Sequence, residues 1–174
     1  MCGIAGFVGV AASTARPRVR QALCRLTHRG PDGEGWYTSD DAVIGMRRLA
    51  IIDLACGDQP IYNEDRTIAV VCNGELYEYP ERFRELIAGG HRLQSQSDVN
   101  LIPHYYEEAG RDAFREIHGM FAAAIWDAPR RRLTLARDRA GKKPLYYARV
   151  DQSLAFASEI PALLELLRNG EGGT

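Results

Sequence analysis

Apolar and polar residues alternate along the chain in a way that predicts many short strands and a few helices. Eight runs rich in β-branched, aromatic or small apolar residues are interpreted as strands: 3–10, 35–37, 43–46, 67–73, 121–126, 133–137, 145–148 and 154–157. Four segments have helical spacing: 17–26, 80–88, a stretch from near Asn100 to Ala109, and 159–168. Two sheets packed face to face, with helices on their outer surfaces, would bury these apolar faces.

The length and composition are those of one compact domain. The chain has 174 residues, 45% of them hydrophobic and 26% charged, and it contains no internal repeat or linker. Its last residues, Asn169-Gly-Glu-Gly-Gly-Thr174, have the composition of a flexible end. We therefore expect a domain over 1–168 and a flexible tail over 169–174.

The charge balance bears on the partners that the chain can take. Lys and Arg number 22 against 23 Asp and Glu, a net charge of −1, so we expect no nucleic acid and no anionic membrane as partner. No apolar run reaches the roughly 18 residues of a membrane span, and the first residues lack the layout of a secretion signal. We expect a cytoplasmic protein.

Four cysteines are spread along the chain without a C-x-x-C pair, which argues against a metal cage or a disulfide framework. Cys24 lies in a predicted helix and Cys72 in a predicted strand, and we expect both to be buried as small hydrophobes. Cys56 carries no signal. Cys2 differs because it directly follows the initiator methionine.

Other residues that could carry chemistry are interpreted as structural. His28 lies in a loop rich in Gly and Pro, and we expect it to brace that loop. His91, His104 and His118 lack metal-ligand spacing, so no metal site is predicted. Arg47 is expected to be an ordinary surface charge.

Cys2 opens the run Cys2-Gly-Ile-Ala-Gly-Phe-Val-Gly9, whose glycines, at every third position, keep the backbone uncrowded and could let a substrate approach. The run lacks the spacing of a phosphate loop. If Met1 is removed, the thiol and a free α-amine lie on one residue. An α-amine has a reference pKa of about 7.7–8.0, so roughly a tenth is neutral at pH 7 and can accept the thiol proton. Such a nucleophile carries its own base.

Nine motifs, in order and over nearly the whole chain, resemble the glutamine-dependent asparagine synthetases: Cys2-Gly-Ile-Ala-Gly, His28-Arg-Gly-Pro-Asp-Gly33, Arg47-Arg-Leu-Ala-Ile-Ile-Asp53, Asn73-Gly-Glu-Leu-Tyr77, Ser97-Asp98, Gly119-Met-Phe-Ala122, Arg137-Asp138, Gly141-Lys-Lys-Pro-Leu-Tyr146 and Ser158-Glu159. Any one of them is weak evidence. The order of all nine makes a chance resemblance negligible.

The resemblance implies an α+β fold of the N-terminal-nucleophile hydrolase type, a four-layer αββα sandwich in which helices cover two mainly antiparallel sheets. It also implies that Cys2 attacks the side-chain amide of glutamine. The Asn73 side-chain amide and the Gly74 backbone N–H would hold the oxyanion. Collapse would release ammonia and leave a glutamyl thioester, which water cleaves to glutamate.

Free glutamine carries an α-carboxylate and an α-ammonium group, and both charges need partners when they are buried. By the same resemblance Arg48 grips the carboxylate through two parallel N–H bonds, and Asp98 and Glu75 face the ammonium group. Backbone groups of the next segment would line the same pocket: Leu49, Ala50, Ile51 and Ile52.

The chain departs from the family pattern in three respects. Met46 stands where a histidine is common and Asn100 where a glutamate is common, and both flank the expected pocket. The family normally continues into a synthetase domain with a Ser-Gly-Gly-x-Asp-Ser loop, which this sequence lacks. We expect no cofactor on this chain, ATP and Mg being needed only on that domain, and we expect a synthetase domain or subunit to receive the ammonia.

Two alternatives stay open. The chain could be a non-catalytic module that keeps the fold to bind a synthetase partner, although such modules often lose the cysteine. It could also be an N-terminal-nucleophile hydrolase for another amide, which would need neither Arg48 nor Asp98.

Overall fold

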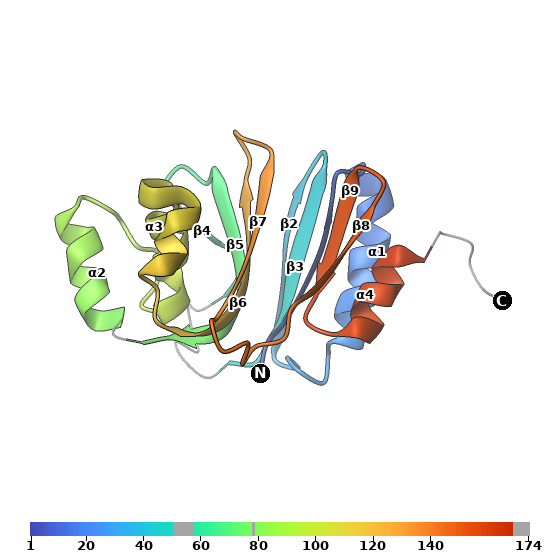
Figure 1. Ribbon diagram of the computed structural model, residues 1–174, viewed down its shortest axis with the longest axis horizontal. Coiled ribbons are helices and arrows are strands. Elements are labelled where there is room, and N and C mark those ends of the chain that lie inside the picture. Colours follow the sequence, from blue (N-terminus) through green and yellow to red (C-terminus); the bar gives the residue numbers. More distant parts are fainter. Residues whose placement is uncertain (51–57, 78, 169–174) are drawn as a thin grey trace.

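The computed structural model describes residues 1–50, 58–77 and 79–168, and within them the chain forms four layers, helix, sheet, sheet, helix (Figure 1). One sheet has the strand order β2-β3-β1-β9-β8 and the other β4-β5-β6-β7, with every neighbouring pair antiparallel. Helices α1 and α4 cover the outer face of the first sheet, and α2 and α3 that of the second. The predicted sandwich is confirmed.

The strands are β1 (Gly3–Val8), β2 (Gly33–Ser39), β3 (Ala42–Arg48), β4 (Ile61–Tyr62), β5 (Ile68–Leu76), β6 (Gly119–Asp127), β7 (Arg132–Arg137), β8 (Tyr146–Val150) and β9 (Ser153–Ala157). The helices are α1 (Ala12–Arg25), α2 (Tyr79–Ala88), α3 (Leu101–Ala109) and α4 (Ile160–Leu167), with the short 3-10 helices η1 (Asp98–Asn100) and η2 (Gly110–Arg115). The expected tail, 169–174, lies outside the described residues.

Alternation along each strand divides its side chains between two apolar cores. In β1, Ile4 and Val8 point into the core between the sheets, whereas Ala5 and Phe7 point toward α1 and α4. A third core joins the second sheet to α2 and α3. None of the helices in the described part of the chain has the length and apolar character that a membrane crossing requires.

Helix α1 begins five residues before the predicted start, with Pro17 inside it. Proline removes the amide that would bond to the carbonyl of Ser13, but both residues are exposed, so water can replace that bond. The buried face of α1 consists of Ala15, which precedes the predicted start, and of Val19, Ala22 and Leu23. Cys24 lies off this face and is exposed, so the expectation of burial was wrong for Cys24, whereas Cys72 is buried as predicted.

The glycines after Cys2 serve packing, which corrects the expectation that they open the backbone to substrate. A Cβ atom on Gly6 would lie 2.4 Å from the Phe156 ring. One on Gly3 would lie 3.0 Å from the Cβ atom of Leu26. Strand β1 thus runs through the centre of its sheet, between β3 and β9, where neighbouring side chains leave no room for a larger residue.

Two motifs from opposite ends of the chain anchor β1 next to Cys2. The Ser158 hydroxyl accepts a hydrogen bond from the Ile4 N–H at 2.9 Å, and the Ser158 N–H donates to the Ile4 carbonyl. Arg29 donates to the Cys2 carbonyl at 3.0 Å and forms an ion pair with Glu159. These contacts explain why the Ser-Glu and His-Arg motifs accompany an N-terminal nucleophile.

Replacing Ser158 by alanine should lower the free energy of unfolding by about 1–3 kcal/mol, because the buried Ile4 N–H loses its acceptor. Urea denaturation would measure the change. Ser153→Ala, at the start of β9 and only half-buried, should cost much less. Equal losses for the two variants would contradict a specific role for the Ser158 hydroxyl.

Candidate active site

Three predicted site residues come from the inward faces of the two sheets. Cys2 lies two residues before Ile4, and Arg48 two residues after Met46, and both Ile4 and Met46 belong to the core between the sheets. Alternate residues of a strand share one face, so Asn73 lies on the same face of its strand as Ala69 and Val71. These two residues reach the core between the sheets from the opposite sheet. In Figure 1 the N-terminus accordingly lies at the lower edge of the molecule, between the two sheets.

A cavity of about 140 Å³ opens at this edge. Its walls come from both sheets, from η1 and from the loop between β7 and β8: Met1, Cys2, Arg48, Leu49, Gln59, Cys72, Asn73, Gly74, Glu75, Ser97, Asp98, Val99, Met120 and Lys143. Seven of the predicted site residues therefore surround one space.

Cys2 is half-buried and lies against the backbone of Leu49. The Leu49 N–H donates to Sγ at 3.4 Å, and Sγ lies 3.7 Å from the Leu49 carbonyl oxygen. Met1 occupies part of the cavity wall, and Lys143 Nζ approaches its sulfur at 3.5 Å.

The side-chain amide of Asn73 is held without a partner. Asn73 is 1% exposed, and its Nδ2 atom makes no hydrogen bond within the described residues. Leaving a buried donor unpaired is costly in a folded protein. An amide kept in this state beside a cysteine is suited to bind negative charge that develops during a reaction.

The Gly74 amide lies on the open edge of β5. In an antiparallel strand the N–H groups of residues i and i+2 point to the same edge. The Cys72 N–H donates to the Gln59 side chain and the Leu76 N–H to Asp98, both on the edge away from β6, so the Gly74 N–H between them points the same way. Strand β4 pairs with Ala69 and Val70, and within 1–50, 58–77 and 79–168 no strand pairs with this edge at Gly74.

Gly74 is also required by the neighbouring strand. A Cβ atom on it would lie 2.4 Å from the Met120 carbonyl oxygen and 2.6 Å from the Phe121 Cα atom. Asn73 and Gly74 are therefore part of a continuous strand, although the Asn-Gly pair would by itself suggest a hairpin turn.

The two charged residues expected to bind the ends of glutamine are both buried. Arg48 is 9% exposed, and its Nη1 donates to Asp58 Oδ1 at 2.9 Å. The side chain of Asp58 is 83% exposed, and an ion pair with an exposed partner contributes little free energy. A ligand carboxylate can therefore replace Asp58 on Arg48. Arg47 points to the other face, where it is only 16% exposed and binds Glu34 and the Gly30 carbonyl. It braces the structure and is not the ordinary surface charge that was expected.

Asp98, at the start of η1, is 3% exposed and accepts a hydrogen bond from the Leu76 N–H at 2.5 Å. Burial raises the pKa of its carboxyl group, and the nearby Glu75 adds to this, whereas the hydrogen bonds from Leu76 and Val99 oppose it. A ligand cation in the cavity would compensate the buried charge.

The remaining predictions have different outcomes. Leu49 and Glu75 line the cavity. Ala50 is not on its wall, and its N–H donates to Asp32 Oδ2 at 2.8 Å. Ile51 and Ile52 lie outside the described residues, as does Cys56. His28 braces its loop through Glu159, as expected.

Lys143 and Gln59 are among the residues of the cavity wall that the sequence did not assign to the site. Lys143 is only 9% exposed and adds a positive charge. It lies in the Gly141-Lys-Lys-Pro motif, which is the one signal that could have drawn attention to it. Gln59 bonds both to the N–H and to the carbonyl of Cys72, and so satisfies the edge of β5 where no strand lies.

The two departures from the family pattern do not line the cavity. Met46 is buried in the core between the sheets, 1% exposed. Asn100 is fully buried, and its Nδ2 donates to the Ser95 carbonyl at 2.9 Å. Met46 and Asn100 can therefore affect the shape of the cavity only indirectly, through the positions of β3 and η1.

Comparison with known proteins bears on what this cavity is. A family model described as a glutamine amidotransferase domain matches residues 1–171. The chain belongs to this family. The amidotransferase domain is 40% identical over 167 residues to glutamine-hydrolyzing asparagine synthetase 2 of Bacillus subtilis (strain 168) and 41% identical over 166 residues to glutamine-hydrolyzing asparagine synthetase 3 of Arabidopsis thaliana. Each match covers 94% of this chain, but only 22% and 28% of the two relatives.

Solved structures agree on the fold of the amidotransferase domain. Glutamine phosphoribosylpyrophosphate amidotransferase from B. subtilis, in complex with ADP and GMP, superposes with a TM-score of 0.77 at 19% identity. A structure described as the allosteric regulatory enzyme of purine biosynthesis gives 0.78 at 20% identity. Both matches cover 95% of this chain and 43% of the other.

Proposed function

We propose that this amidotransferase domain hydrolyses L-glutamine to L-glutamate and ammonia, with Cys2 as the nucleophile. The observation that carries the proposal is the cavity in which the Cys2 thiol, the unpaired Asn73 amide and the buried charges of Arg48 and Asp98 meet. The two relatives named above are both glutamine-hydrolyzing enzymes.

The reaction begins when the α-amine of Cys2, exposed by loss of Met1, accepts the thiol proton. Sulfur attacks the side-chain carbonyl carbon of glutamine, and the Asn73 amide and the Gly74 N–H bind the oxygen that becomes negative. The ammonium formed on Cys2 returns its proton to the leaving nitrogen, which departs as ammonia. Water then attacks the thioester, releasing glutamate and the thiol.

Binding of the substrate uses its two charges. Arg48 takes the α-carboxylate, exchanging its contact with the exposed Asp58, and Asp98 with Glu75 takes the α-ammonium group. Leu49 to Ile52 supply backbone contacts on the same side. Glutamine inside a peptide has neither charge, so it makes neither contact and leaves the buried Asp98 carboxylate without a cation.

We further propose that the ammonia serves an asparagine-synthetase-like amidation on a synthetase domain or separate subunit. This domain spans about a quarter of the curated relatives that it matches. The hydrolytic step needs no cofactor; ATP and Mg would be used on the synthetase side. The thiol must stay reduced, which favours a reducing compartment such as the cytoplasm.

The decisive experiment combines intact mass with product analysis. Protein that has lost Met1 should release glutamate and ammonia in equal amounts from L-glutamine, and a glutamine-like electrophile should label Cys2. Glutamine capped at both ends should not react. Activity on the capped substrate would instead favour a hydrolase for another amide. Correctly processed protein that gives neither products nor label, yet binds a synthetase, would favour a non-catalytic module.

Replacing Asp98 by asparagine should raise the KM for glutamine roughly 30-fold or more, because the ligand ammonium group loses its buried partner. The same substitution should raise the free energy of unfolding at pH 7. The pKa of Asp98 is raised in the folded state, so ionisation costs stability as pH rises from the reference pKa, near 4, through the folded value. At pH 7 the Asp98→Asn protein should be the more stable, and the difference should shrink toward pH 4.

Steady-state kinetics and urea denaturation at the two pH values measure both effects. Asp112→Asn, which changes an exposed aspartate, provides the matched control and should leave KM and stability unchanged. An unchanged KM in Asp98→Asn would remove Asp98 from the binding site. Lower stability at pH 7 would contradict the raised pKa.

A further inference from the structure

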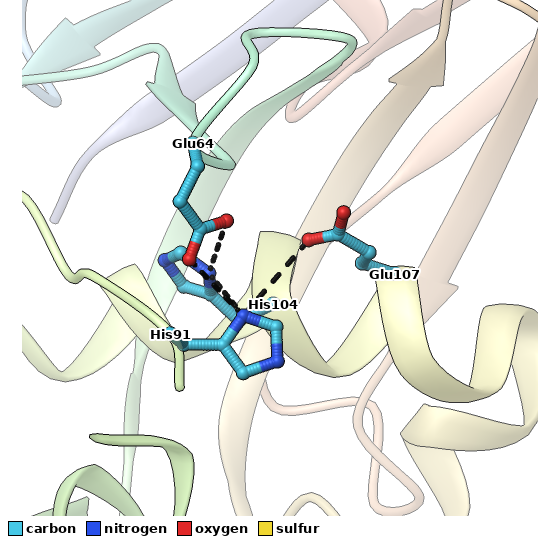
Figure 2. A group of neighbouring side chains, drawn as sticks. All are labelled: Glu64, His91, His104 and Glu107. Atoms are coloured by element: carbon cyan, nitrogen blue, oxygen red, sulfur yellow. Dashed lines mark hydrogen bonds and ion pairs between the residues drawn. The ribbon is translucent and has the colours of Figure 1, made fainter. Parts of the chain in front are cut away.

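Four side chains that the glutaminase chemistry does not use converge beside α3, on the outer side of the second sheet (Figure 2). Glu64 comes from the turn between β4 and β5, His91 from the segment after α2, and His104 and Glu107 from one face of α3. Each offers one ligand atom, and these four atoms lie within 4.8 Å of one another.

The distances within this cluster are those of a metal-ligand shell. The two imidazole Nδ1 atoms are 3.3 Å apart. Glu64 oxygens lie 3.1 Å from His91 Nδ1 and 3.4 Å from His104 Nδ1, and a Glu107 oxygen lies 4.0 Å from His91 Nδ1. Ligand atoms bound tetrahedrally at the usual zinc distances of 2.0–2.1 Å are about 3.3–3.4 Å apart. Glu107, whose oxygen lies 4.0 Å from His91 Nδ1, must move inward to complete the shell.

The surrounding contacts orient the ligands. The Arg92 N–H donates to Glu64 Oε1 at 2.7 Å, and His91 Nε2 lies 3.2 Å from Glu108 Oε1. A carboxylate on the far nitrogen of a histidine fixes the tautomer whose Nδ1 lone pair points into the cluster. His104 is fully buried, and its Nε2 has no hydrogen-bond partner within the described residues, so all its polar contacts lie on the Nδ1 side.

We propose that Glu64, His91, His104 and Glu107 form a binding site for a divalent transition-metal ion of the zinc type. Two imidazoles select against Mg²⁺ and Ca²⁺, which prefer oxygen ligands alone. Four protein ligands close the coordination shell, so the site is structural. It ties three segments together and fixes α3, which follows directly from the segment that carries Asp98. The spacing of these residues along the chain does not reveal the metal site, because its ligands come from three separate segments.

The test uses ZnCl₂ as the probe and the Cys2→Ala protein, in which the active-site thiol cannot bind the metal. After treatment with a chelator, calorimetric titration should show one Zn²⁺ bound per chain, and Co²⁺ should give the visible absorption of a four-coordinate site. At a Zn²⁺ concentration 100 times Kd, Tm should rise by roughly 5–10 °C.

His91→Gln and Glu107→Gln should each weaken Zn²⁺ binding at least about 10-fold. Both positions are partly exposed, so these variants keep the fold, unlike a change at the fully buried His104. His118→Gln and Glu81→Gln, outside the cluster, should bind as the parent does. Absence of stoichiometric binding, equal binding after His91→Gln and Glu107→Gln, or equal loss in the control variants would overturn the proposal.

Discussion

Cys2→Ala should reduce glutamate release by a factor on the order of 10⁴–10⁶, because no other described residue of the cavity wall can form the thioester. Cys72 also lies on the cavity wall, but it is fully buried. Burial raises the pKa of its thiol well above the usual value, with the charges of Asp98 and Cys2 adding to the shift. It therefore stays protonated and cannot substitute for Cys2. Assays of glutamate release from the variant and the wild type measure this loss.

The same variant should still bind glutamine, since Arg48 and Asp98 remain in place, and calorimetry can detect this. Cys24→Ala supplies the matched control, because Cys24 is exposed on α1, away from the cavity. It should keep full activity. Residual turnover of Cys2→Ala above about a thousandth of the wild-type rate would mean that another residue is the nucleophile.

Asn73→Ala should lower kcat by about 10²–10³ and leave KM within about twofold, because the Asn73 amide binds the oxyanion and not the amide of the ground state. The Asn73 Nδ2 atom makes no hydrogen bond within the described residues, so the substitution breaks no such bond there. We therefore expect little loss in the free energy of unfolding. Steady-state kinetics with urea denaturation would separate the two effects.

Asn63→Ala is expected to show the reverse pattern. Asn63 is equally buried, but it accepts a hydrogen bond from the Ile68 N–H at 2.9 Å and donates to Thr67. Its loss should cost about 1–3 kcal/mol of stability and leave kcat unchanged. If Asn73→Ala were destabilised to the same degree and retained its kcat, the amide would be structural.

The sequence carries enough information for the layers and for most of the candidate site. Period-two alternation locates the strands, and the same parity that places Ile4 and Met46 in a core directs Cys2 and Arg48 to one cavity. The choice of Arg48 over Arg47 could therefore be made from pattern and resemblance together. The order of the motifs supplied Asn73 and Asp98.

Other features depend on contacts between distant segments and could not be predicted. Strand β4 has two residues, too few for any periodic signal. Gln59 completes the edge of β5 from outside the sheet, and Lys143 reaches the cavity from a loop. The role of Gly6 depends on Phe156, which is 150 positions away and reaches it only across the sheet. Local propensity contains none of this information.

The central place of β1 sets an order of events during synthesis. Strand β1 must pair with β9 and bond to Ser158, which are synthesised much later than β1 itself. At translation rates of about 5–20 residues per second, the N-terminus waits roughly 10–30 s for these partners. The nascent chain thus carries an ordinary, unactivated cysteine behind an accessible Met1. If Met1 is removed in this interval, the nucleophile is uncovered before the pocket that activates it exists.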